Sequence, residues 1–216
     1  MKHDIVTEQR DFFYNKGYIE FEGIITTTQA DDIRAAVAET LEQRRDGEER
    51  YRNSSYCAGR DLWRDNESIK KIVKSKKIAE IVVLLTNKKT IRLAYDQNVT
   101  AKTPLVAEGA SLTELSALQG VIAGAMLCLK PDTTEEAPEY FPKEKGSAVL
   151  FRDDFIMTEK PAGNGIYHYI VYCEETTVYI YNENDENCHT LRALGYDYGD
   201  ALRNEYHPLL LRYRCQ

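Results

Sequence analysis

The spacing of the apolar residues changes at about residue 89, and this change constrains the fold more than any other feature of the sequence. Before that point apolar residues recur every three or four positions, which predicts amphipathic helices. After it they alternate with polar residues or form short runs between turn residues, which predicts strands. Helices at one end and antiparallel strands at the other are typical of an α+β protein, with a barrel or sandwich flanked by helices.

The first part of the chain is predicted to hold four helices and one strand. Helices are expected over 4–16, 26–45, 66–74 and 75–87. Asn66 and Ser75 stand where N-caps belong, because their side-chain oxygens can accept hydrogen bonds from free backbone N–H groups. A strand is expected over 18–23, where apolar and acidic residues alternate, and the charged segment 46–56 is expected to be an exposed loop.

Strand patterns dominate the second part. They cover 91–97, 119–129, 147–152, 166–173 and 177–182. An acidic loop with prolines at 131–145 and the turn PAGNG at 161–165 interrupt them. No internal repeat and no linker rich in Gly or Ser divides the chain. We therefore expect one domain over 1–216, with helical support over about 1–89 and a strand core over about 90–216.

Charge and cysteine content indicate where the protein works. The formal net charge of −7 disfavours nucleic acid as a partner. The lysines between positions 70 and 89 alternate with Ile and Val, the usual pattern of a solvated helix face. Five widely spaced cysteines without a CxxC fit reduced thiols in a cytosol. No apolar leader is present, and the run 115–129 is shorter than the roughly 20 residues of a membrane span, so we expect a cytoplasmic protein without a membrane partner.

The segment between residues 97 and 121, a loop between two predicted strands, is where we expect a functional site. It contains no recognisable catalytic or metal-binding motif. This loop holds no His, no Cys and no carboxylates at metal-binding spacing, and no phosphate-binding glycine loop is present. Elsewhere, His168 shares a strand face with Ile166 and Ile170, which predicts a core or pocket-lining histidine. Asp153 and Asp154 directly follow a strand, as carboxylates at a barrel rim do.

Five segments carry a resemblance to a known family, and their order along the chain is its strength. They are YNKGYIEFEGIITTTQADDIRAAVAE at 14–39, the segment from RDLW to AYDQ at 60–97, GSAVLFRDD at 146–154, PAGNG at 161–165 and YHPLLLR at 206–212. The chain resembles the phytanoyl-CoA dioxygenase branch of the Fe(II)/2-oxoglutarate oxygenases. Gln97 and Lys102 resemble a Gln and a Lys that this family places before its active-site loop. The resemblance implies a double-stranded β-helix, or jelly-roll, core flanked by the N-terminal helices.

The resemblance also implies an iron site that the sequence does not supply. The family holds Fe(II) with an HxD pair and a distal His, and leaves positions open for 2-oxoglutarate and dioxygen. The HxD pair is expected within 112–120, which reads LTELSALQG, and the distal His near 157–159, which reads MTE. The arginine for the cosubstrate carboxylate is expected on 166–173, which has none. We therefore predict a pseudoenzyme with no metal ligands, no cofactor and no catalytic residues.

A barrel mouth remains a natural ligand site when the metal is lost. The side chains expected to line it are Tyr95, Gln97, Lys102, Asp153 and His168. We predict that the protein is non-catalytic and binds a small molecule or a protein partner there.

Two alternatives stay open at this point. In the first, Asp153 or Asp154 joins Glu114 and His168 as replacement metal ligands of an atypical oxygenase. In the second, a resemblance to a chlamydial protein described as a divalent-cation-dependent regulator implies an iron-responsive transcriptional repressor. The sequence shows no helix-turn-helix, no His- and Cys-rich sensor site and no basic domain, so nucleic acid is not the expected partner.

Overall fold

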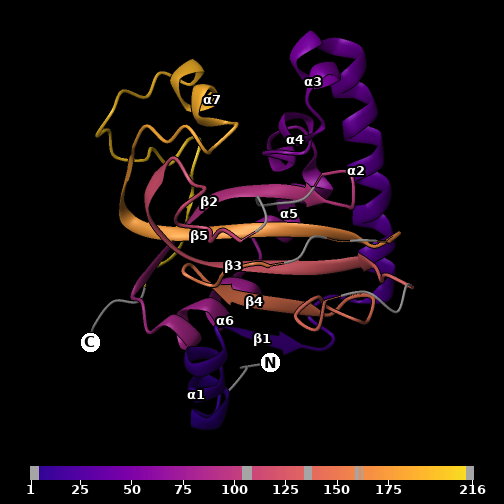
Figure 1. Ribbon diagram of the computed structural model, residues 1–216, viewed down its shortest axis with the longest axis vertical. Helices are drawn as coiled ribbons and strands as arrows, with labels where there is room; N and C mark the ends of the chain where they lie inside the picture. Colours follow the sequence, from indigo (N-terminus) through magenta and orange to yellow (C-terminus); the bar gives the residue numbers. More distant parts are fainter. Residues whose placement is uncertain (1–4, 104–108, 134–137, 159–160, 162, 213–216) are drawn as a thin grey trace.

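A six-stranded antiparallel sheet crosses the molecule in Figure 1, a computed structural model that describes residues 5–103, 109–133, 138–158, 161 and 163–212. The strand order is β1-β4-β3-β5-β2-β6. The strands are β1 Tyr18–Phe21, β2 Thr90–Val99, β3 Leu118–Lys130, β4 Ala148–Arg152, β5 Ile166–Tyr179 and β6 Leu209–Arg212. The helices are α1 Thr7–Lys16, α2 Thr27–Gly47, α3 Glu49–Asn53, α4 Ser55–Ala58, the 3-10 helix η1 Leu62–Arg64, α5 Glu67–Val73, α6 Lys76–Thr86 and α7 Cys188–Ala193.

Each face of the sheet carries an apolar layer. Successive side chains of a strand point to opposite faces, and β5 shows both directions. Ile170 and Tyr172 pack with residues of α1, α2, α5 and α6 in what we term the helix-side layer. Tyr169 and Val171 pack with residues of the later loops and α7 in the loop-side layer. The predicted α+β organisation, with the early helices beside a sheet formed mostly by the later strands, is confirmed.

Local sequence explains where the early helices begin and end. Thr26 caps α2 through a hydrogen bond from the backbone N–H of Gln29 to its hydroxyl oxygen at 3.1 Å. Asn66 caps α5, as predicted, by accepting from the N–H groups of Ser68 and Ile69. Ser75 also stands at the N-cap of α6, but its side chain makes no capping hydrogen bond.

The prediction of a loop over 46–56 is wrong, because this segment holds the short helices α3 and α4. Helices of four or five residues are too short to show an apolar period, so the sequence pattern could not reveal them. The hydroxyl oxygen of Ser54 accepts the N–H of Cys57 at 3.1 Å and starts α4. These helices form part of the wall around the site described below.

The later part differs from the prediction at three places. The two strands expected over 166–173 and 177–182 are one continuous strand, β5. Helix α7 and edge strand β6 were not predicted as elements. Figure 1 places α7 above β2, across from α3 and α4, so three unpredicted helices stand at this end of the sheet. Within the described residues, no helix combines the length and apolar character that crossing a membrane requires.

Candidate functional site: a charge-balanced cavity beside a packed apolar core

The residues just before the expected HxD segment meet the segment expected to hold the distal His. Ala110 and Met157 form an isolated β-bridge, with the N–H of Met157 donating to the carbonyl of Ala110 at 3.2 Å. The side chains that the bridge brings together are apolar. Leu112 and Met157 are buried in the loop-side layer at 1% and 3% exposure. Neither side chain offers the imidazole or carboxylate group that holds Fe(II) in non-heme oxygenases, and Glu159 lies outside the described residues.

Aromatic rings fill the space next to this bridge. Tyr169 stacks on Phe151 with ring centroids 5.8 Å apart, and Phe141 meets Tyr167 edge-on at 5.1 Å. Tyr169 also covers Gly124 so closely that a Cβ atom there would stand 2.5 Å from the ring. Burial raises the pKa of the Tyr169 hydroxyl well above its usual value, so the group stays protonated. This interior is packed as an apolar core.

The proposed replacement ligands do not converge either. Glu114 accepts hydrogen bonds from the N–H and hydroxyl of Ser111 at 2.8 and 2.9 Å, and these bonds lower the pKa of its carboxyl group. Asp153 lies near Thr113, whose hydroxyl oxygen is 3.4 Å from Asp153 Oδ2. Burial and the neighbouring Asp154 carboxylate raise the pKa of Asp153. His168 is on the other face of the sheet. In the part of the chain that the structure describes, no group of three His, Cys, Asp or Glu side chains could hold a metal ion.

The position of His168 follows from strand alternation. Its Nε2 atom lies 3.0 Å from Oδ2 of Asp96, and both side chains are fully buried. Oδ1 of Asp96 accepts the backbone N–H of Trp63, a member of the helix-side layer. His168 therefore faces the helices, as its predicted companions Ile166 and Ile170 do, and not the layer that contains Tyr95.

The other predicted pocket residues are divided between two places. Tyr95 and Gln97 come together around the segment that follows α4. The Arg60 guanidinium lies 3.2 Å from the Tyr95 ring centroid, and Gln97 donates from Nε2 to the carbonyl of Tyr56 at 3.1 Å. Lys102 is exposed in a turn, and Asp153 lies at the end of β4. The predicted set of five thus does not assemble into one pocket, because a sequence shows neither which side of a bulged strand a residue takes nor which loops fold over it.

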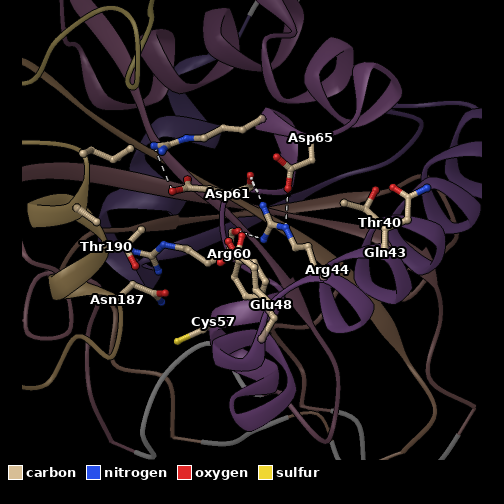
Figure 2. A pocket seen from close by; sticks show the side chains of 15 residues that line it. Thr40, Gln43, Arg44, Glu48, Cys57, Arg60, Asp61, Asp65, Asn187 and Thr190 are labelled. Carbon is tan, nitrogen blue, oxygen red and sulfur yellow. Dashed lines mark hydrogen bonds and ion pairs between the residues drawn. The ribbon is translucent and has the colours of Figure 1, made fainter.

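A different cavity, of about 570 Å³, lies between α2, α4, η1 and α7. Figure 2 shows Arg44 of α2 on one side of it, with Asn187 and Thr190 of the α7 region opposite and Arg60 and Cys57 between them. This volume falls in the range of about 300–1,000 Å³ that is usual for small-molecule sites. The lining residues come from segments about 140 residues apart in the chain, roughly the separation between α2 and α7. No local sequence motif could therefore predict the cavity.

Each arginine in the wall of this cavity is paired with a carboxylate. Arg44 Nε donates to Asp65 Oδ2 at 2.6 Å, and Arg44 also donates to the carbonyls of Ala58, Arg60 and Asp61. Figure 2 shows the Arg44 side chain directed toward Asp65. The other two pairs are Arg64 with Asp61 at 3.2 Å and Arg60 with Asp185 at 3.6 Å. The wall is therefore polar and close to electrically balanced, with Glu48 as a further lining carboxylate beside the three pairs.

A second, much smaller cavity of about 10 Å³ adjoins the first. The two share four lining residues, Arg60, Asp61, Asn187 and Thr190. His207 lines the smaller cavity, and its Nδ1 atom lies 2.8 Å from the carbonyl oxygen of Ala94. Burial lowers the pKa of His207 to about 4, so the ring is neutral at pH 7. Nδ1 must then carry the proton that it donates to Ala94, which leaves Nε2 as an acceptor.

Four buried polar atoms around the two cavities form no hydrogen bond with any described residue. Two are acceptors, Oδ1 of Asp61 and Nε2 of His207. Two are donors, Nδ2 of Asn187 and Nε of Arg64. Asn187 and His207 are only 5% and 1% exposed. Sequence reasoning singled out none of Asn187, Arg60 and His207 as site residues, because none of them belongs to a binding or catalytic motif.

Comparison with known proteins supports the fold. No family model matches the sequence, and no curated protein matches it. Among solved structures, SnoK, a non-heme alpha ketoglutarate dependent carbocyclase from nogalamycin biosynthesis, is 15% identical with a TM-score of 0.72, over 95% of this chain and 96% of its own. The epimerase SnoN, solved with Fe3+, alpha ketoglutarate and nogalamycin RO, is 16% identical with a TM-score of 0.66, over 93% and 96%.

The structure of CT296 from Chlamydia trachomatis is also similar, at 15% identity and a TM-score of 0.53, over 81% of this chain and 99% of that one. At such identities the likeness shows the fold alone. The predicted jelly-roll fold of the Fe(II)/2-oxoglutarate oxygenases, with helices before it, is confirmed, as is the likeness to a chlamydial protein. The narrower resemblance to the phytanoyl-CoA dioxygenase branch stays a prediction.

Proposed function

We propose that this chain is a non-catalytic binding protein built on the oxygenase fold, and that it binds a small molecule. The observation that carries the proposal is the apolar lining at the positions of the expected ligands. Leu112 and Met157, from the two segments expected to hold the ligands, are buried in the same apolar layer, and Tyr169 packs against Gly124 in that layer. The residues present thus do not fit Fe(II), which takes imidazole and carboxylate ligands in such enzymes.

The cavity between α2 and α7 supports the small-molecule part of the proposal. It has a suitable volume, and four unpartnered polar atoms surround it and the smaller cavity beneath. In ligand sites, a few such groups fix the orientation of the ligand. Neither the atypical oxygenase nor the cation-responsive repressor has a comparable observation in its favour.

The test is equilibrium dialysis of the protein against Fe(II) without oxygen, with and without 2-oxoglutarate, followed by an assay for succinate in air. SnoN, whose structure holds Fe3+ and alpha ketoglutarate, is the positive control. We expect no stoichiometric iron in the protein and no succinate above the protein-free background. One iron per chain, or turnover of 2-oxoglutarate, would overturn the proposal.

A cytoplasmic location is part of the same proposal. Cys57, Cys128, Cys173 and Cys188 carry free thiols in the described structure. Cysteines stay reduced, as free thiols, in the cytosol. Burial raises the pKa of Cys128 and of Cys173 to about 12, so both thiols resist oxidation through a thiolate.

A further inference from the structure

We infer that the cavity between α2 and α7 takes an uncharged ligand with several hydroxyl groups, such as a sugar or a cyclitol. This inference rests on the proposed function, because it names the class of small molecule that the binding protein recognises. It is argued from the charge balance of the wall, from the four unpartnered polar atoms and from the size of the smaller cavity.

The charge balance decides against a charged ligand. Arg44, Arg60 and Arg64 already have carboxylate partners, Asp65, Asp185 and Asp61. An anion such as 2-oxoglutarate or a phosphate ester would have to compete with those carboxylates for the guanidinium groups. A cation would compete with the arginines for the same carboxylates, and Glu48, which also lines the cavity, already interacts with another group. A charged ligand would thus lose its hydration without meeting a free countercharge, which is costly.

The unpartnered atoms indicate which neutral groups fit. Asp61 Oδ1 and His207 Nε2 need a donor, whereas Asn187 Nδ2 and Arg64 Nε need an acceptor. A hydroxyl group supplies one donor and two acceptor lone pairs, so one kind of group satisfies both sets. A ligand with acceptors alone would leave Asp61 and His207 unsatisfied. Because an unsatisfied buried polar group is costly, the pattern selects for hydroxyls.

The smaller cavity fixes where one hydroxyl would enter. Its volume of about 10 Å³ matches a single water-sized group. It is lined by Asp61, Asn187 and His207, and it shares Asn187 and Thr190 with the large cavity. A ligand ring seated in the large cavity can therefore place one hydroxyl oxygen in the small one, between the side chains of His207 and Asn187.

The test is calorimetric titration with two uncharged probes, myo-inositol and D-glucose, and two charged counterparts, D-glucose 6-phosphate and D-glucosamine. We expect an uncharged probe to bind more tightly than either charged one. Asn187→Leu should weaken that binding about tenfold, because the ligand loses one hydrogen bond in a buried position. Asn184→Leu, in an exposed position of the same loop, should leave it unchanged.

Thr190→Val provides a second variant if Asn187→Leu does not fold, and thermal unfolding of each free protein checks for this. A charged probe that binds more tightly would overturn the inference, as would the absence of binding by both uncharged probes at millimolar concentration. Binding that neither Asn187→Leu nor Thr190→Val weakens would also overturn it. None of these results would contradict the proposed function. Only uptake of iron or turnover of 2-oxoglutarate would do so.

Discussion

Arg60 and Asp185 form a buried ion pair that ties the end of α4 to the loop before α7. Arg60 Nη2 lies 3.6 Å from Asp185 Oδ2, with the side chains 7% and 1% exposed. Oδ2 also accepts the backbone N–H of Ala117 at 2.9 Å, and Oδ1 accepts that of Asn187. One carboxylate thus joins a wall of the cavity, the start of β3 and the residue that precedes α7.

We expect Asp185→Asn to lower the free energy of unfolding by about 3 kcal/mol, because it leaves the Arg60 guanidinium buried without a countercharge. Urea unfolding followed by circular dichroism measures the change. Glu67→Gln is the matched control, since it breaks the exposed pair with Lys70 and should have little effect. A variant as stable as the wild type would show that Asp185 does not balance Arg60.

His207 should make stability depend on pH between about 6.5 and 4. Its pKa in the folded protein is about 4 because of burial, whereas the unfolded value is near 6.5. Between these values the unfolded chain binds a proton that the folded protein does not, so stability falls as the pH falls. The full contribution is roughly 3 kcal/mol.

Urea unfolding of the wild type and His207→Gln at several pH values between 7 and 4 isolates this effect as a difference in slope. The variant should lose less stability than the wild type over this range. His189→Gln, at an exposed histidine, should keep the wild-type slope. Identical slopes for wild type and His207→Gln would contradict the prediction.

Gly124 and Tyr169 are coupled by contact. A Cβ atom on Gly124 would stand 2.5–2.7 Å from three atoms of the Tyr169 side chain, so Gly124→Ala should destabilise the protein by about 1–3 kcal/mol through overpacking. Tyr169→Leu alone should also destabilise it, by leaving a cavity. The double variant should be more stable than the sum of the two changes predicts, and a double-mutant cycle measures the difference. Strict additivity would argue against the contact.

Thr26 and Ser75 offer a comparison of two N-caps. The Thr26 side chain accepts a hydrogen bond from the N–H of Gln29, so Thr26→Ala should cost about 1 kcal/mol of stability. Ser75 makes no such bond, and Ser75→Ala should cost clearly less. Thermal unfolding of both variants under the same conditions tests the order. Equal losses would show that cap identity, not the observed hydrogen bond, sets the effect.

Much of the fold was predictable because its apolar residues recur at the regular spacing of a helix or a strand. The amphipathic helices and the buried strands have such a period, and the structure has them within a few residues of the predicted bounds. The interruption expected after Cys173 was wrong for a physical reason. Glu174 and Glu175 break the apolar pattern, but they form ion pairs with Lys88 and Arg212 at the sheet surface, and the strand continues to the buried Thr177.

The site was less predictable because it depends on tertiary contacts. The sequence places His168 correctly with Ile166 and Ile170, yet it cannot show that Tyr95 faces the opposite layer across a bulge between Leu93 and Tyr95. Apart from α2, the cavity is formed by short helices and loops without an apolar period. The relevant property of its polar atoms is that they have no hydrogen-bond partner among the described residues. Only the folded structure shows this.

The position of β5 in the sheet has a consequence for the order in which the chain folds. β5 lies between β2 and β3, and these two strands have no other connection to each other within the sheet. A nascent chain therefore carries β2 and β3 with exposed edges until residues 166–179 leave the ribosome. β1 likewise waits for β4, since Tyr18 pairs with Phe151. Such distant pairings give a high contact order, so we expect folding in milliseconds to seconds, with the sheet closing late.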